Sequence, residues 1–324
     1  AETSYARLVT QLFGDRMFIS NATGCSSIWG GPAATSPYTV NKEGRGPAWA
    51  NSLFEDNAEH GYGMLQGHTA VRQMVIEQTE QLLAAGVPEG AAAAAQAWLD
   101  ARDDSAASKD ASAAFVAELE KLAEGEGEAS ALAAKILANK DYLAKKSIWI
   151  FGGDGWAYDI GYGGLDHVLA SGEDVNVFVF DTEVYSNTGG QASKASNIGQ
   201  VAQFAAAGKN IAKKSLAEIA MQYGYVYVAQ VAMGAKPAQT IKAIAEAEAY
   251  PGPSLIIGYS PCEMHAIKGG MKNCQEEMKK AVDCGYWNLF RYNPAAPAGK
   301  KFTLDCKEPA GGYQEFLMNE ARYS

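Results

Sequence analysis

The sequence predicts an α/β protein whose doubly wound, mainly parallel sheet carries helices on both faces. Apolar segments of strand composition alternate with segments of helical spacing over most of the 324 residues, which is typical of βαβ units. Two of the strands, 148–151 and 178–180, end abruptly in glycine or in acidic and amide residues. Such loops at the carboxyl ends of parallel strands are where open α/β sheets bind ligands.

The first half of the chain is predicted to hold one short helix, one strand and a long loop. Residues 8–13 read as a helix and 17–20 as the first strand. Residues 26–51 are rich in Gly, Pro, Ser and Thr, so we expect an ordered loop without regular elements there. A long helix follows at 52–85. The Ala-rich stretch 89–146 predicts two or three amphipathic helices with no visible chemistry.

The second half is predicted to alternate regularly between helices and strands. Helices are expected at 199–207, 215–223, 237–250 and 272–284. Strands are expected at 225–231, 254–259 and 287–292. The Pro-, Gly- and Lys-bearing sequence at 293–324 indicates a linker and the start of a C-terminal extension.

Composition excludes several classes of protein. A formal net charge of -10 argues against a nucleic-acid partner, which needs clustered Lys and Arg. No apolar run approaches the roughly 20 residues of a membrane span, and the chain does not open on a signal-peptide pattern. Five cysteines in a long chain do not form a secreted disulfide framework. We therefore expect a soluble, cytoplasmic protein with reduced thiols and no membrane partner.

A constellation of oxygen ligands predicts a magnesium site. Asp154 lies between Gly153 and Gly155 at a strand end, and Thr182 and Val184 follow the next strand. A carboxylate, a hydroxyl and a backbone carbonyl could meet at one Mg²⁺ and leave positions for phosphate oxygens. The alternative role for Asp154 is to cap the following helix.

Four motifs carry a resemblance to a known family. They are Gly153-Asp154-Gly155, residues 187–191 (Asn-Thr-Gly-Gly-Gln), residues 21–27 (Asn-Ala-Thr-Gly-Cys-Ser-Ser) and residues 258–262 (Gly-Tyr-Ser-Pro-Cys). Together they resemble the diphosphate-binding region of pyruvate:ferredoxin (flavodoxin) oxidoreductases. The general thiamine signature ends in Asn where this chain has Thr182, and both residues supply a side-chain oxygen.

The resemblance implies a thiamine diphosphate-binding domain at 1–292, with 86–146 as a helical insertion. It also implies a set of cofactor-binding residues: Glu2, Cys25, Gly153, Asp154, Gly155, Trp156, Thr182, Glu183, Val184, Tyr185, Ser186 and Asn187. Within this set, Asn187 also faces the 2-oxoacid and is the expected catalytic residue. Asp154, Thr182 and Val184 are the expected Mg²⁺ ligands.

The resemblance further implies an iron-sulfur centre. Cys25 and Cys262 follow predicted strands and match two ligands of a 4Fe-4S cluster, which needs four thiolates. The family supplies the other two from a Cys-x-x-Cys placed immediately before the position that matches Ala1. We expect Cys274, Cys284 and Cys306 to be structural.

The implied reaction is oxidative decarboxylation of pyruvate to acetyl-CoA and CO2. Electrons would pass through 4Fe-4S clusters to ferredoxin or flavodoxin, with coenzyme A as the acyl acceptor and a homodimer as the assembly. The carboxylate that activates the thiazolium would come from a pyrimidine-binding domain of the same enzyme. We therefore assign no acid-base role to the histidines, which are His60, His68, His167 and His265.

Three other functions are alternatives for this sequence. A non-redox thiamine diphosphate-dependent 2-oxoacid decarboxylase or synthase would need the same anchor but neither Cys25 nor Cys262. A nicotinamide-binding domain would use Asp181 as a ribose contact, but Tyr158 stands where its third glycine belongs. A binding module with a structural cofactor is the non-enzymatic alternative. Which 2-oxoacid would be used does not follow from the sequence.

Overall fold

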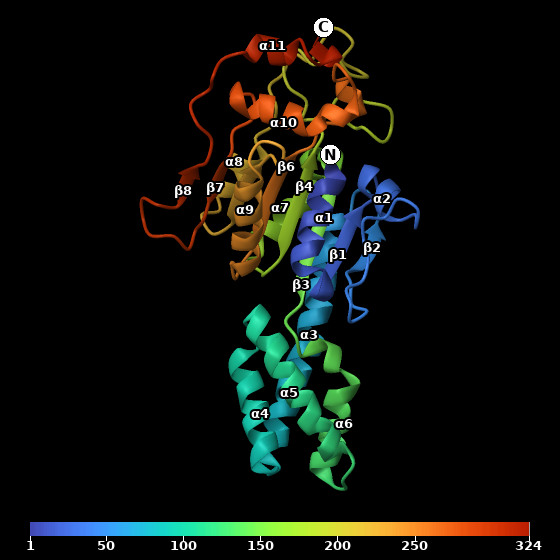
Figure 1. Ribbon diagram of the computed structural model, residues 1–324, viewed down its shortest axis with the longest axis vertical. Helices are drawn as coiled ribbons and strands as arrows, with labels where there is room; N and C mark the ends of the chain where they lie inside the picture. The colour runs from blue at the N-terminus through green and yellow to red at the C-terminus, as the bar shows by residue number, and fades with distance from the viewer. Residues whose placement is uncertain (324) are drawn as a thin grey trace. The chain divides into compact units, whose positions relative to one another are not determined.

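A computed structural model describes residues 1–323 and divides into two compact units (Figure 1). Unit 1 comprises residues 1–62 and the chain from 148 onwards, and unit 2 comprises Gly63–Ser147. Helix α3 (Asn57–Ala84) begins in unit 1 and ends in unit 2. Among residues 1–323, no helix is both long and apolar enough to cross a membrane.

Unit 1 is built on one eight-stranded sheet with the order β2-β1-β3-β4-β6-β5-β7-β8. The strands are β1 (Met17–Ala22), β2 (Ala48–Ser52), β3 (Ser147–Gly153), β4 (Asn176–Asp181), β5 (Tyr227–Val231), β6 (Ser254–Tyr259), β7 (Phe290–Tyr292) and β8 (Phe302–Leu304). The pairs β1–β2, β3–β4, β4–β6 and β5–β6 are parallel, and the pairs that β7 makes with β5 and β8 are antiparallel. Strands β4 and β6 are buried throughout, which explains their continuous apolar composition. The predicted α/β class is confirmed.

The helices of unit 1 connect and cover these strands. They are α1 (Glu2–Phe13), α2 (Cys25–Gly30), the start of α3, α7 (Tyr162–Ala170), α8 (Leu216–Met221), α9 (Pro237–Ala249), α10 (Cys274–Asp283) and α11 (Tyr313–Leu317). Helix α7 makes the crossover between the parallel neighbours β3 and β4, as the spacing of their loops predicts. Helices α8 and α9 contact β5, and α9 also contacts β6. Figure 1 shows α10 and α11 together at one end of this unit.

Two predicted elements differ from the structure. The helix expected at 199–207 is wrong, because the backbone there folds back on itself: Gln203 N donates to Gly190 O and Gly199 N to Lys209 O. Gly199 has φ of 81°, a left-handed conformation that ends a helix. The loop expected at 26–51 contains most of α2 and β2. Strand β2 has the sequence Ala-Trp-Ala-Asn-Ser, which lacks β-branched residues and is therefore a weak strand signal, and it lies at the edge of the sheet, paired with β1 alone.

The segment after residue 292 is part of unit 1. Strand β8 pairs with β7, Ala310 N donates to Asp283 O, and Ala321 N donates to Ala266 O. The domain boundary at 292 and the role of 293–324 as a linker and the start of a C-terminal extension stay predictions.

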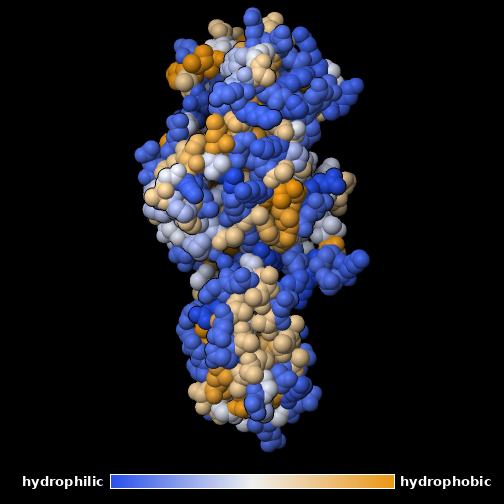
Figure 2. Space-filling view, turned by 60° about the vertical axis from the view of Figure 1, so that its left-hand side comes forward, coloured by the Kyte–Doolittle hydropathy of each residue, from blue (hydrophilic) through white to orange (hydrophobic). Residues whose placement is uncertain are grey.

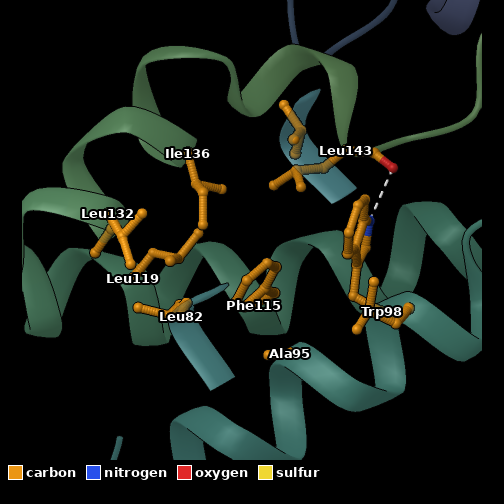
Figure 3. Close-up of a cluster of buried hydrophobic side chains, with 11 residues drawn as sticks. Leu82, Ala95, Trp98, Phe115, Leu119, Leu132, Ile136 and Leu143 are labelled. Carbon is orange, nitrogen blue, oxygen red and sulfur yellow. Dashed lines mark hydrogen bonds between the residues drawn. The ribbon is translucent and has the colours of Figure 1, made fainter. Parts of the chain in front are cut away.

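Unit 2 is a helical body with its own apolar core. It contains most of α3 together with α4 (Glu89–Ala101), α5 (Ser105–Ala123) and α6 (Glu128–Ala138), so the predicted amphipathic helices are present. Their apolar faces meet in the cluster of Figure 3, whose labelled members are Leu82, Ala95, Trp98, Phe115, Leu119, Leu132, Ile136 and Leu143. The Trp98 ring stacks 5.8 Å from Phe115, and its Nε1 donates to Leu143 O at 2.9 Å.

The surface is mostly polar. Figure 2 shows hydrophilic residues over most of the visible face of both units, with apolar residues in smaller patches. The most exposed large apolar side chains of unit 1 include Phe204, at 94% exposure, and Ile211, both in the loop before α8.

Candidate active site

Four strands that lie side by side in the sheet bring the predicted site residues together. The order β1-β3-β4-β6 runs through the middle of the sheet. Cys25 follows β1, Asp154 follows β3, Thr182 follows β4 and Cys262 follows β6. Parallel neighbours have their carboxyl ends at one edge, so residues far apart in sequence meet there.

The three predicted magnesium ligands converge on one point. Thr182 Oγ1 donates to Asp154 Oδ1 at 2.7 Å and lies 3.0 Å from Val184 O. Ser193 Oγ donates to the other carboxylate oxygen, Asp154 Oδ2, at 2.6 Å. All four residues are buried. Ser193 was missed by the sequence analysis because it lies in a loop without a recognisable pattern.

The surroundings of Asp154 disfavour the ionised form of its carboxyl group. Burial, followed by the nearby charge of Asp181, raises the pKa of Asp154 to about 7, although Ser193 and Thr182 donate hydrogen bonds to it. A bound cation would favour the ionised form. The donor set of carboxylate, hydroxyl and carbonyl oxygen fits a hard cation such as Mg²⁺. Residues 1–323 contain no cluster of three or more His, Cys, Asp or Glu side chains that could hold a metal. The triad is not such a cluster, because Asp154 is its only residue of these four types.

The glycine-rich loop after β3 is closely packed against protein side chains. A Cβ on Gly155 would lie 2.6 Å from the Tyr185 ring and 3.0 Å from Phe54, so only glycine fits. Trp156 is fully buried, and Gly153 pairs with Phe180 at the end of the β3–β4 ladder. Close packing against Tyr185 and Phe54 therefore favours glycine at position 155, and the expected contact of Gly155 with the cofactor stays a prediction.

The side chain of Glu183 is committed to protein partners. Arg322 Nη1 lies 2.7 Å from its Oε2, and Lys213 Nζ lies 3.3 Å from its Oε1. Tyr286 Oη and Asn197 Nδ2 each donate to it at 2.8 Å. Burial alone would raise the pKa of Glu183, but Lys213 and then Arg322 outweigh it and lower this pKa to about 2.

A cavity of about 380 Å³ opens beside the triad. Its lining includes Glu2, Cys25, Ser186, Asn187 and Cys262. Asn187 is exposed, whereas Glu2 is buried and its Oε2 accepts a 2.6 Å hydrogen bond from Trp29 Nε1. Ser186 Oγ lies 3.3 Å from Cys25 Sγ and 3.4 Å from Thr182 Oγ1. The cavity and the triad are therefore joined through Ser186.

The two cavity cysteines are free thiols. Burial, followed by the charge of Glu2, raises the pKa of Cys25 to about 11. Burial raises the pKa of Cys262 to about 12. Both are therefore protonated near neutral pH, and a metal would have to displace those protons. Cys274, Cys284 and Cys306 do not line this cavity.

Two residues that contact the site loop were not found from the sequence. His265 is fully buried, and its Nε2 lies 2.8 Å from Thr182 O. A carbonyl oxygen only accepts, so Nε2 is the protonated nitrogen. Arg322 reaches Glu183 from near the end of the chain, and no local pattern indicates that contact.

Comparison with known families first defines the class of protein. The model described as "Thiamine pyrophosphate enzyme, C-terminal TPP binding domain" matches residues 123–257. This range covers β3, β4 and the loops that carry Asp154, Thr182 and Val184. The α/β fold agrees with this match, and the segment 123–257 is therefore similar to a thiamine pyrophosphate-binding domain.

Curated relatives then show which proteins the whole chain is similar to. The chain is 55% identical to the pyruvate-flavodoxin oxidoreductase of Klebsiella pneumoniae and 57% identical to the pyruvate:ferredoxin oxidoreductase of Moorella thermoacetica. Both matches cover 100% of this chain, but they cover 27% of the Klebsiella protein and 28% of the Moorella protein. The mitochondrial pyruvate dehydrogenase [NADP(+)] of Euglena gracilis is 48% identical over 99% of this chain and 18% of its own length. The chain is similar over its whole length to these pyruvate oxidoreductases and spans about a quarter of the length of the bacterial ones, which confirms the resemblance.

Among solved structures, a 2-oxoglutarate:ferredoxin oxidoreductase from Magnetococcus marinus matches 80% of this chain and 60% of its own. Its sequence identity is 16% and its TM-score is 0.42.

Proposed function

We propose that this chain is the diphosphate- and magnesium-binding part of a pyruvate:ferredoxin or pyruvate-flavodoxin oxidoreductase. The reaction is oxidative decarboxylation of pyruvate to acetyl-CoA and CO2. Electrons leave through 4Fe-4S clusters to ferredoxin or flavodoxin, and the assembly is a homodimer. The convergence of Asp154, Thr182 and Val184 at one buried point is the observation that carries the proposal.

In this proposal the chain holds the charged end of the cofactor. Thiamine diphosphate supplies carbanion stabilisation when it is bound. Asp154, Thr182 Oγ1 and Val184 O provide oxygen ligands for Mg²⁺, which neutralises the diphosphate. Ser193 fixes the orientation of the Asp154 carboxylate through its 2.6 Å hydrogen bond. The carboxylate that activates the thiazolium comes from a pyrimidine-binding domain outside this chain.

The cavity is the proposed place for substrate and for the first electron acceptor. Asn187 is exposed at the cavity, where its amide could hydrogen-bond the oxygens of pyruvate. Cys25 and Cys262 lie on the same cavity and supply two thiolates of a 4Fe-4S cluster. Two thiolates do not complete such a cluster, so the other two come from beyond the described residues.

Calorimetry on the intact enzyme tests the metal site. Asp154→Ala should weaken Mg²⁺-dependent binding of thiamine diphosphate on the order of a hundredfold, because the cation loses its one carboxylate ligand. Asp166→Ala is the control, since Asp166 lies on α7 and accepts a hydrogen bond from Tyr223 instead. Unchanged affinity in Asp154→Ala would overturn the assignment.

The iron content separates the redox proposal from its alternative. A non-redox thiamine diphosphate-dependent decarboxylase or synthase has no need of Cys25 and Cys262. Iron and acid-labile sulfide in the intact enzyme support the oxidoreductase. Their absence, in protein that was purified without oxygen and still binds the cofactor, supports the non-redox enzyme.

A further inference from the structure

The residue between two proposed metal ligands has an unusual backbone. Glu183 has φ of 59°, in the left-handed region that residues other than glycine seldom adopt. This conformation turns the chain so that Thr182 Oγ1 and Val184 O come within 3.0 Å of each other. Surrounding contacts must hold such a backbone in place.

The Glu183 side chain supplies those contacts. Its two carboxylate oxygens receive four partners, from Lys213, Asn197, Tyr286 and Arg322. Its carbonyl oxygen accepts from Gln200 Nε2 at 3.1 Å. These partners come from the loop before α8, from the residues after α10 and from the end of the chain.

Residues 320–322 lie against the loop that carries Thr182 and Glu183. Arg322 Nε donates to Glu320 Oε2 at 2.6 Å while its Nη1 pairs with Glu183. The other Glu320 oxygen lies 3.5 Å from Nδ1 of His265, whose Nε2 donates to Thr182 O. Arg322 therefore contacts Glu183 directly, and Glu320 binds Arg322 and lies beside His265, which donates to Thr182 O.

We propose that Glu183 and Arg322 are positioning residues for the magnesium site, joined by a buried ion pair that shapes the loop carrying Thr182 and Val184. This inference rests on the proposed function. It gives Glu183 a role in orienting the ligands on either side of it instead of contacting the cofactor. Outer residues that orient metal ligands typically change metal affinity about 10- to 100-fold when they are replaced.

The test uses Mn²⁺ as a probe in the intact enzyme, because Mn²⁺ takes the same oxygen ligands as Mg²⁺. Glu183→Gln keeps the shape of the side chain and removes its charge, and Arg322→Gln removes the other half of the pair. Each should raise the dissociation constant of Mn²⁺ about tenfold at saturating thiamine diphosphate. Each should also alter the paramagnetic resonance line shape of bound Mn²⁺, which reports the geometry of its ligands. The Arg322→Lys enzyme, which keeps the positive charge, should bind Mn²⁺ more tightly than the Arg322→Gln enzyme.

Arg291→Gln is the matched control. Arg291 is another mostly buried cation of unit 1, paired with Glu246 at 2.7 Å and with Asp305 at 2.8 Å. Its loss should lower thermal stability without changing the Mn²⁺ line shape. Tyr286→Phe removes one hydroxyl, which donates to Glu183 and accepts from Asn197 and Arg322. It is a smaller change than Arg322→Gln and tests the same contacts if Arg322→Gln does not fold.

The outcomes separate this inference from the proposed function. If the unmodified enzyme binds Mn²⁺ with thiamine diphosphate and Asp154→Ala does not, the metal site stands. If Glu183→Gln, Arg322→Gln and Tyr286→Phe then match the unmodified enzyme in affinity and line shape, the positioning role is overturned. If the unmodified enzyme binds no Mn²⁺ at all, the proposed metal site fails, and the positioning role fails with it.

Discussion

Thr182 Oγ1 lies 2.7 Å from Asp154 Oδ1, although the two residues are 28 positions apart and each follows a different strand. The contact exists because β3 and β4 are parallel neighbours, with Gly153 opposite Phe180. Each loop leaves its strand at the same edge, and the acidic and hydroxyl side chains face each other there. The parallel sheet thus assembles the proposed magnesium site from two short loops.

Magnesium binding should depend on pH near neutrality. The pKa of Asp154 is raised to about 7, so the proton and the cation compete for one carboxylate. Below pH 7 the apparent Mg²⁺ affinity of the intact enzyme should fall, approaching tenfold per pH unit, and binding should release a proton. Calorimetry at pH 6, 7 and 8 in buffers of different ionisation enthalpy measures both effects. Affinity that is flat over this range would contradict the environment described for Asp154.

Glu183 should contribute stability that acid removes. Its folded-state pKa of about 2 lies below the ordinary value of 4.5, so the stabilisation is fully present above about pH 4.5. It is lost as the pH falls toward 2. A depression of this size corresponds to a few kcal/mol, on the order of 3. Glu183→Gln should therefore lower the unfolding midpoint at pH 7 but have less effect near pH 2. Denaturant unfolding of the unmodified protein and of Glu183→Gln between pH 2 and pH 7 tests this prediction. An equal loss of stability at both pH values would contradict it.

Trp98 should be essential to the core of unit 2. Trp98→Ala removes a fully buried ring and should destabilise the unit by about 3–5 kcal/mol. Trp98→Phe keeps a ring beside Phe115 and removes one of two donors to Leu143 O, which still accepts from Arg72 Nη1 at 3.2 Å, so it should cost less, about 1 kcal/mol. Hydrogen exchange over α4, α5 and α6 measures the change. Gln96→Ala, an exposed change on the same helix, is the control and should leave protection unaltered.

The sequence was sufficient to predict the site where local patterns decide the structure. Strand ends mark Cys25, Asp154, Thr182 and Cys262, and the rule that parallel neighbours share an edge brings them together. Contacts made by an irregular segment could not be predicted in this way. Arg322 lies in a tail with no periodicity, and its pairing with Glu183 depends on the tertiary path of the chain.

The wrong helix at 199–207 has a similar cause. Its composition suits a helix, but the left-handed Gly199 and the hydrogen bond from Gln203 N to Gly190 O favour a loop folded on itself. Tertiary hydrogen bonds therefore overrode a weak local preference. Strand β2 is the opposite case, since it pairs with β1 over five residues although it lacks the β-branched residues that are typical of strands.

Cys25 and Cys262 should each be required for one iron-sulfur cluster of the intact enzyme. Their partly buried thiols have raised pKa values of about 11 and 12, so only a strongly bound metal would ionise them. A serine hydroxyl is harder still to ionise and is a poor ligand for iron. Cys25→Ser and Cys262→Ser should therefore lose one cluster signal in paramagnetic resonance of the reduced enzyme, with a matching loss of iron. Cys306→Ser is the control, because Cys306 does not line the cavity and its thiol lies 3.9 Å from Asn288. Full cluster signals in both cavity variants would show that these two thiols are structural, and the non-redox alternative would then gain support.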